Sequence, residues 1–136
     1  MRYLKRYLVN FASKLPQPLR KTLYRVLGLN FNNSEIRHNV FFDSPKQVNI
    51  GKNCFINRGV EFHVGFSEDI TIEMKENVYI GPNVLFCCVS HEQGDSEKRA
   101  GNNIYESIVV EKGVWIGANS TILSGVHIGK GAIIAA

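Results

Sequence analysis

The chain has 136 residues, of which 44% are hydrophobic and 21% charged, and this length and composition indicate one folded domain. No apolar run approaches the ~18 residues of a membrane-spanning helix, so a transmembrane protein is not expected. The three cysteines, Cys54, Cys87 and Cys88, are too few and too badly spaced for a disulfide framework or a zinc ribbon. We therefore predict that the protein is located in a reducing compartment, the cytoplasm.

The net charge of +4 is distributed unevenly along the chain. Residues 1–30 contain seven basic residues and no acidic one, whereas the rest of the chain contains nine basic and twelve acidic residues. In a nucleic-acid-binding domain the positive charge would decorate the folded core. This pattern therefore predicts no nucleic-acid partner.

Residues 1–30 are predicted to form a basic helical segment of two short helices, separated at Pro16 and Pro18. One face of the first helix carries large apolar residues at helical spacing: Tyr3, Leu4, Tyr7, Leu8 and Phe11. Two interpretations are open. The helix pair contacts an anionic membrane, with basic residues toward the headgroups, or it is a cap that packs its apolar stripe on the domain.

From Ile50 onward, apolar residues recur every six positions. Eleven of these twelve positions are apolar: Ile50, Ile56, Phe62, Met74, Ile80, Phe86, Val110, Ile116, Ile122, Ile128 and Ile134. The exception, Glu68, falls in a stretch (64–69) where a turn bulge is expected. Small or medium residues follow four positions later, and glycine often follows directly, which suits tight turn dihedrals.

A period of six predicts short parallel strands that wind, three at a time, into a triangular coil. Each interior residue should pack on the residue eighteen positions further on. Ile116 is thus expected against Ile134, and Ile56 at the level of Met74. The predicted fold is all-β, with the coil over residues 31–136.

Residues 91–106 interrupt the repeat with a polar, glycine- and asparagine-rich stretch. Because intact repeats flank it on both sides, it is predicted to be a loop ejected from the wall of the coil. Such loops often carry function.

The run Trp115-Ile116-Gly117-Ala118-Asn119, with His91 at the root of the loop, resembles the hexapeptide-repeat acyltransferases. The resemblance covers residues 48–136 and lies with the sugar and polysaccharide O-acetyltransferases. That branch includes maltose and galactoside acetyltransferases and enzymes that acetylate capsule or lipopolysaccharide. The resemblance implies a left-handed parallel β-helix, a homotrimer, and acetyl-CoA bound in the groove between neighbouring protomers.

The resemblance also implies roles for individual residues. His91 matches the catalytic base, and Asn57 matches an active-site asparagine suited to stabilise an oxyanion. Trp115 matches a tryptophan expected to line the intersubunit groove. Ala118 and Ala136 match small residues that let the pantetheine arm of the cofactor approach the backbone.

Some residues have a second interpretation. Asn57 could simply close its turn, and Arg99 could hold the acceptor or a cofactor phosphate, or else form a local ion pair with Asp95 or Glu97. His63 and His127 are expected at the surface. The sequence has no closely spaced histidine pair, so no metal site is predicted.

The expected function is O-acetylation of a sugar or of a cell-envelope polysaccharide precursor by direct attack, without an acyl-enzyme on Cys87 or Cys88. The basic segment suits a lipid-linked glycan acceptor and peripheral contact with the inner membrane face. The sequence ends three residues into the repeat begun at Ile134, so the C-terminal coil is expected to be truncated. The alternatives are a non-enzymatic scaffold, an inactive fragment and, less favoured because of the short N-terminal segment, a serine acetyltransferase.

Overall fold

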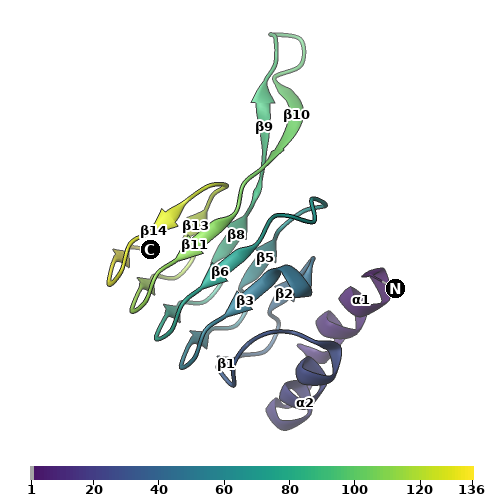
Figure 1. Ribbon diagram of the computed structural model, residues 1–136, viewed down its shortest axis with the longest axis vertical. Helices are drawn as coiled ribbons and strands as arrows, with labels where there is room; N and C mark the ends of the chain where they lie inside the picture. The colour runs from purple at the N-terminus through teal and green to yellow at the C-terminus, as the bar shows by residue number, and fades with distance from the viewer. Residues whose placement is uncertain (1) are drawn as a thin grey trace.

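The computed structural model describes residues 2–136 (Figure 1). The chain begins with two helices, α1 (Arg2–Ala12) and α2 (Gln17–Leu27), and continues as a coil of short strands from which one hairpin projects. A 3₁₀ turn, η1, spans Pro45–Gln47. Figure 1 shows the helices at the end of the coil where the first strands lie, and the hairpin extending away from the coil body.

Within residues 2–136 the coil consists of three parallel sheets. Sheet 1 contains β1 (Glu35–Ile36), β4 (Phe55–Ile56), β7 (Tyr79–Ile80), β12 (Trp115–Ile116) and β15 (Ile133–Ile134). Sheet 2 contains β2 (Phe41–Phe42), β5 (Glu61–His63), β8 (Leu85–Cys87) and β13 (Thr121–Ile122). Sheet 3 contains β3 (Val48–Ile50), β6 (Ile72–Met74), β11 (Ile108–Val110) and β14 (His127–Ile128). The predicted coil of parallel strands with a helical N-terminus is confirmed.

The core is a column of interior side chains, one from each strand of each coil. In sheet 1 the register partners are Ile36, Ile56, Ile80, Ile116 and Ile134. In sheet 2 the rings of Phe42, Phe62 and Phe86 stack with centroids 5.0 and 5.1 Å apart. These three rings are fully buried, so each coil is held to the next by apolar contact as well as by backbone hydrogen bonds.

The coils differ in length, which corrects the predicted stacking. Successive partners in the sheet 1 column are 20, 24, 36 and 18 residues apart, so only Ile116 and Ile134 have the predicted spacing. Ile56 lies opposite Ile80, and Met74 lies opposite Ile50 in sheet 3 instead. The spacing of 24 arises from the connection between β5 and β6, which contains the exposed Glu68, and the spacing of 36 arises from the inserted segment between β8 and β11.

Three of the four glycines that directly follow an interior residue are required by close approach, not by the turn dihedrals that the sequence suggested, and the exception is Gly129, which has open space around it. A Cβ at Gly117 would lie 2.7 Å from the backbone N of Ala136 on the next coil. The left-handed backbone conformation occurs two residues later, at Asn119 (φ 60°) and, in other turns, at Asn53 (φ 56°) or Gly59 (φ 69°). Turns of this kind thus combine one residue without a side chain with one that tolerates positive φ, whereas other turns, such as that of Asn57, keep a side chain at the first position.

The interrupting segment is a β-hairpin rather than an irregular loop. Strand β9 (Val89–Gln93) pairs antiparallel with β10 (Ala100–Tyr105). At its tip, the Asp95 carboxylate accepts hydrogen bonds from the backbone N–H groups of Glu97 (3.0 Å) and Lys98 (3.1 Å). The polar sequence fits this geometry, because a hairpin outside the coil exposes both of its faces to water.

The two helices pack on the first coil, but the predicted apolar stripe of α1 does not make the contact. Val9 and Ala12, on the opposite side of α1, are the buried residues. Asn10 fixes this orientation by donating to the carbonyl oxygen of Phe42 and accepting from its N–H, both at 2.9 Å. Tyr24 of α2 packs edge-on against Phe42 at 6.1 Å, and burial raises its pKa. In the described part of the chain, neither helix has the length and hydrophobicity to span a bilayer.

Replacing Phe62 by alanine should lower the free energy of unfolding by about 3–5 kcal/mol, because the change opens a cavity between two stacked rings. Urea titration followed by circular dichroism measures the change. The matched control is Phe66→Ala, since Phe66 is 70% exposed and its loss should alter stability by less than about 0.5 kcal/mol. Equal effects of the two substitutions would contradict the stacked-column core.

Candidate active site

His91 lies on β9 near the base of the hairpin, and its side chain is exposed. Its Nδ1 atom is 3.2 Å from the carbonyl oxygen of Gly101. A carbonyl oxygen can only accept a hydrogen bond, so Nδ1 carries the proton and, in the neutral ring, Nε2 carries the lone pair. The backbone of β10 thus orients the imidazole with a proton acceptor directed away from the hairpin.

Asn57 lies in the turn from β4 to β5, at the corner between sheets 1 and 2. Its Oδ1 atom accepts a hydrogen bond from the N–H of Arg58 at 2.8 Å, which leaves the amide Nδ2 group as the donor for a ligand. The hairpin of His91 leaves the coil at the other edge of sheet 2, between sheets 2 and 3. A single chain therefore separates Asn57 and His91 by the width of sheet 2.

Trp115 is 52% exposed on the outer face of sheet 1. Its register partners are Tyr79 and Ile133, and Tyr79 in turn stacks on Phe55 with ring centroids 4.8 Å apart. Because the side chains of a strand alternate between its faces, these residues form an outward ladder of large side chains opposite the buried isoleucine column.

Ala118 and Ala136 occupy equivalent positions on successive coils, each two residues beyond the paired residues Ile116 and Ile134. Both lie at the corner between sheets 1 and 2, where Asn57 also lies on an earlier coil. The structure thus brings the predicted cofactor residues to the corner of Asn57 and not to that of His91.

Arg99 lies near the tip of the hairpin and is exposed. Its Nη1 atom donates to the carbonyl oxygen of Gly94 at 3.3 Å. Among residues 2–136 the ion pairs do not include Arg99, so the local pair with Asp95 or Glu97 considered from the sequence is not formed.

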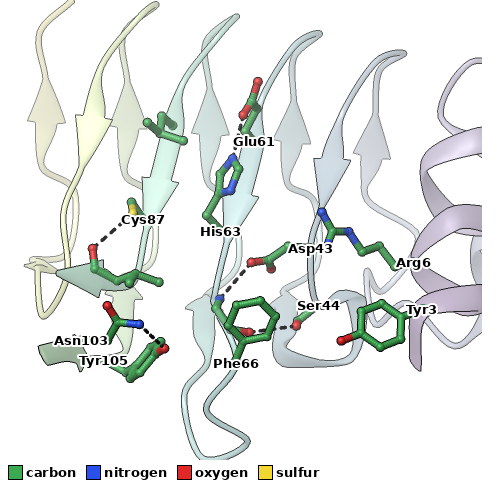
Figure 2. Close-up of a pocket in the computed structure, with 13 residues that line it drawn as sticks. Tyr3, Arg6, Asp43, Ser44, Glu61, His63, Phe66, Cys87, Asn103 and Tyr105 are labelled. Carbon is green, nitrogen blue, oxygen red and sulfur yellow. Dashed lines mark hydrogen bonds and ion pairs between the residues drawn. The ribbon is translucent and has the colours of Figure 1, made fainter. Parts of the chain in front are cut away.

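The sequence did not reveal a pocket of about 520 Å³ on the outer face of sheet 2 (Figure 2). Its walls are α1, the β5–β6 connection and the base of the hairpin. In its floor, His63 donates from Nε2 to the Glu61 carboxylate at 2.7 Å. His63 was expected at the surface, but it is half-buried, with its ring 5.1 Å from that of Phe41. The alternation of side chains along the strand indicates that Glu61 and His63 point outward. It does not indicate that other segments of the chain enclose them.

The rim of the pocket is aromatic, and its largely apolar lining carries a few polar side chains. Tyr3, Phe66 and Tyr105 contribute rings, and Asn103 donates to the hydroxyl of Tyr105 at 2.9 Å. Rings that cover an apolar face, beside carboxylate, imidazole and amide groups that bind hydroxyls, suit a pyranose. The Asp43 carboxylate is already occupied by the N–H groups of Val64 and Gly65, both at 2.9 Å.

His91 does not itself line this pocket, but it lies beside a residue that does. It is the register partner of Asn103, and Val89, two residues earlier on the same strand, is the partner of Tyr105. Partners in an antiparallel pair project from the same face, and Val89, Asn103 and Tyr105 line the pocket. The face of the hairpin that carries His91 is therefore the face that closes the pocket.

The described residues contain no cluster of three or more histidine, cysteine, aspartate or glutamate side chains arranged to hold a metal ion. The cysteines differ in their environments. Cys87 lines the pocket and is half-buried, whereas Cys54 and Cys88 are buried, and burial raises the pKa of Cys88 to about 12.

Iodoacetamide at pH 8 should therefore modify Cys87 well before the other two cysteines, since only a thiolate that the reagent can reach reacts quickly. Mass spectrometry of the native protein should find one labelled cysteine, and urea should expose all three. Cys87→Ser should remove the native label. Labelling of Cys88 at the rate of Cys87 would contradict the described packing.

The model of the bacterial transferase hexapeptide (six repeats) matches residues 107–136. A galactoside O-acetyltransferase of Lactococcus lactis is 32% identical over 106 residues, which are 76% of this chain and 51% of that protein. A galactoside O-acetyltransferase of Escherichia coli is 28% identical over 88% of this chain and 56% of its own length. The chain thus spans about half the length of these curated relatives.

Among solved structures, a hexapeptide-repeat-containing acetyltransferase of Vibrio cholerae, complexed with acetyl coenzyme A, is 27% identical. It superposes with a TM-score of 0.77 over 96% of this chain and 73% of its own. Such neighbours imply the left-handed sense for the coil. The repeat matches a hexapeptide family model, and in sequence and fold the chain is similar to hexapeptide-repeat acetyltransferases over most of its length.

Proposed function

We propose that the chain is an O-acetyltransferase that moves an acetyl group from acetyl-CoA to a hydroxyl of a sugar or of a cell-envelope polysaccharide precursor. The observation that carries the proposal is His91, held through Nδ1 by Gly101 beside a pocket that suits a pyranose. The names of the galactoside O-acetyltransferases and the acetyl-CoA complex of the Vibrio cholerae neighbour support the reaction class.

The residues present suffice for direct transfer. Nε2 of His91 takes the proton of the acceptor hydroxyl as its oxygen attacks the thioester carbonyl carbon. The tetrahedral intermediate places a negative charge on the former carbonyl oxygen, to which the amide of Asn57 can donate. When the carbon–sulfur bond breaks, the CoA thiolate leaves and takes the proton back from His91. No step needs a covalent intermediate on Cys87.

The site is assembled from two copies of the chain in a homotrimer. Within one chain, Asn57, Ala118 and Ala136 share one corner of the coil, and His91 lies across sheet 2 from them. Packing one copy's corner of Asn57 against its neighbour's hairpin would unite the groups. Closed cyclic symmetry then gives three equal sites. Trp115 and the two alanines would line the acetyl-CoA groove.

The proposed location is the cytoplasm, with the acceptor held at the inner membrane face. The seven basic residues of the first thirty favour an anionic surface there. Arg99, near the tip of the exposed hairpin, would contact a part of the acceptor beyond the sugar in the pocket.

His91→Ala should reduce acetyl transfer by about 10²–10⁴-fold, because the general base is lost. The assay measures thiol release from acetyl-CoA with a panel of galactosides and bacterial glycans. The control is His127→Ala, since His127 is also exposed and binds Glu111 (2.9 Å) on another sheet. The mechanism would be contradicted if thiol release were unchanged in His91→Ala, or if it occurred without an acceptor. The proposed transferase activity would be contradicted if the wild-type protein released no thiol with any acceptor.

The two-copy site predicts complementation between inactive variants. His91→Ala and Asn57→Ala proteins, unfolded together and refolded as mixed trimers, should regain about a quarter of the wild-type sites, since each site takes one residue from each of two neighbours. Each variant refolded alone is the control. Mixed trimers no more active than the separate variants would show that each site is built from one chain.

A further inference from the structure

Helix α1 exposes a continuous apolar face to solvent. We call this the α1 face, and its residues, each between 42% and 74% exposed, are Tyr3, Leu4, Tyr7, Leu8 and Phe11. Half of the fourteen large exposed hydrophobic residues in the described chain lie on α1 and α2. A clustered apolar surface of this kind marks an interaction site in a soluble protein. It is not needed for folding, because α1 packs on the coil through Val9 and Ala12.

The charge beside the α1 face points to an anionic occupant. The first thirty residues contain seven basic residues and no acidic one. Arg20 is buried against backbone carbonyls (2.8 Å to Leu15 O), but Lys5 of α1 is partly exposed and Lys14, just after α1, is exposed. A short helix with tyrosine, leucine and phenylalanine on its free side and basic residues around it matches the chemistry of an anionic lipid surface, which offers apolar depth below negative headgroups.

The α1 face is continuous with the pocket. Tyr3 belongs to both, and Arg6, one turn along α1, lines the pocket with its guanidinium 5.3 Å from the centre of the Phe41 ring. Figure 2 shows Tyr3 and Arg6 extending from α1 at one side of the pocket, with Asn103 and Tyr105 of the hairpin at the other. A surface that binds α1 therefore also borders the mouth of the pocket.

We propose that the α1 face docks the protein on an anionic bilayer and thereby sets the pocket mouth at the headgroup surface, where it takes the glycan of a lipid-anchored acceptor. The choice of acceptor rests on the proposed acetyltransferase function, whereas the docking does not. A helix of eleven residues binds a bilayer weakly by itself, and three copies in one trimer would add their contributions.

Vesicle flotation tests the docking. The wild-type protein should float with vesicles of phosphatidylcholine and phosphatidylglycerol at low salt, bind pure phosphatidylcholine weakly, and be released by high salt. The double variant Tyr7→Ser, Phe11→Ser should lower the partition coefficient by about tenfold or more, because it removes two of the rings that would enter the bilayer. The matched control, Leu123→Ser with Val126→Ser, removes exposed apolar residues remote from the helices and should bind as the wild type does.

Acetyl transfer provides the second readout. Since Tyr7 and Phe11 do not line the pocket, their variant should acetylate a water-soluble galactoside at the wild-type rate but a lipid-anchored galactoside in anionic vesicles about tenfold more slowly. Equal losses on both acceptors would overturn the coupling of docking to substrate choice.

Three results separate the possibilities that remain. The docking is overturned if the wild-type protein does not bind anionic vesicles. It is also overturned if the double variant binds them as well as the wild type does. If light scattering shows that the double substitution dissociates the oligomer, the α1 face is an interface with a second copy of the chain. That result also overturns docking on a bilayer. Vesicle binding that depends on Tyr7 and Phe11, in a protein that releases no thiol with any acceptor, supports the docking and contradicts the proposed function.

Discussion

The rest of the structure depends on the stacking of buried side chains from coil to coil. Ile56, Ile80 and Ile116 are held in register by parallel backbone hydrogen bonds, and Phe42, Phe62 and Phe86 stack beside them. Because this core is a column, each coil is positioned only by its two neighbours. The outer faces are then free to carry side chains that suit function, provided that the inner position stays apolar.

The two insertions in the coil build the pocket without disturbing the column. The β5–β6 connection and the hairpin leave at the same corner, between sheets 2 and 3, and they lengthen two coils to 24 and 36 residues. The register of β5 on β8 is kept, with Phe62 against Phe86 and His63 against Cys87. The inserted residues therefore rise beside the outer face of sheet 2, where Glu61 and His63 form the floor and Tyr105 and Asn103 a wall.

The N-terminal helices connect stability to the site. Asn10 and Tyr24 fix them on Phe42, which covers the first coil with apolar contact. The same packing sets Tyr3 and Arg6 over sheet 2 and turns the α1 face outward. One segment thus protects the core, completes the pocket and provides the surface proposed to meet the membrane.

The sequence by itself determined the column, because a buried position tolerates only apolar side chains and so records its period at Ile50, Ile56 and Ile80. It also located His91 at the root of an inserted segment. Tertiary structure alone decided the rest. A helical stripe shows which residues share a face of α1 but not which face meets the coil, and Asn10 settles that by binding Phe42. Alternation shows that Glu61 and His63 point outward but not that α1 and the hairpin enclose them, since contacts between distant segments leave no local period.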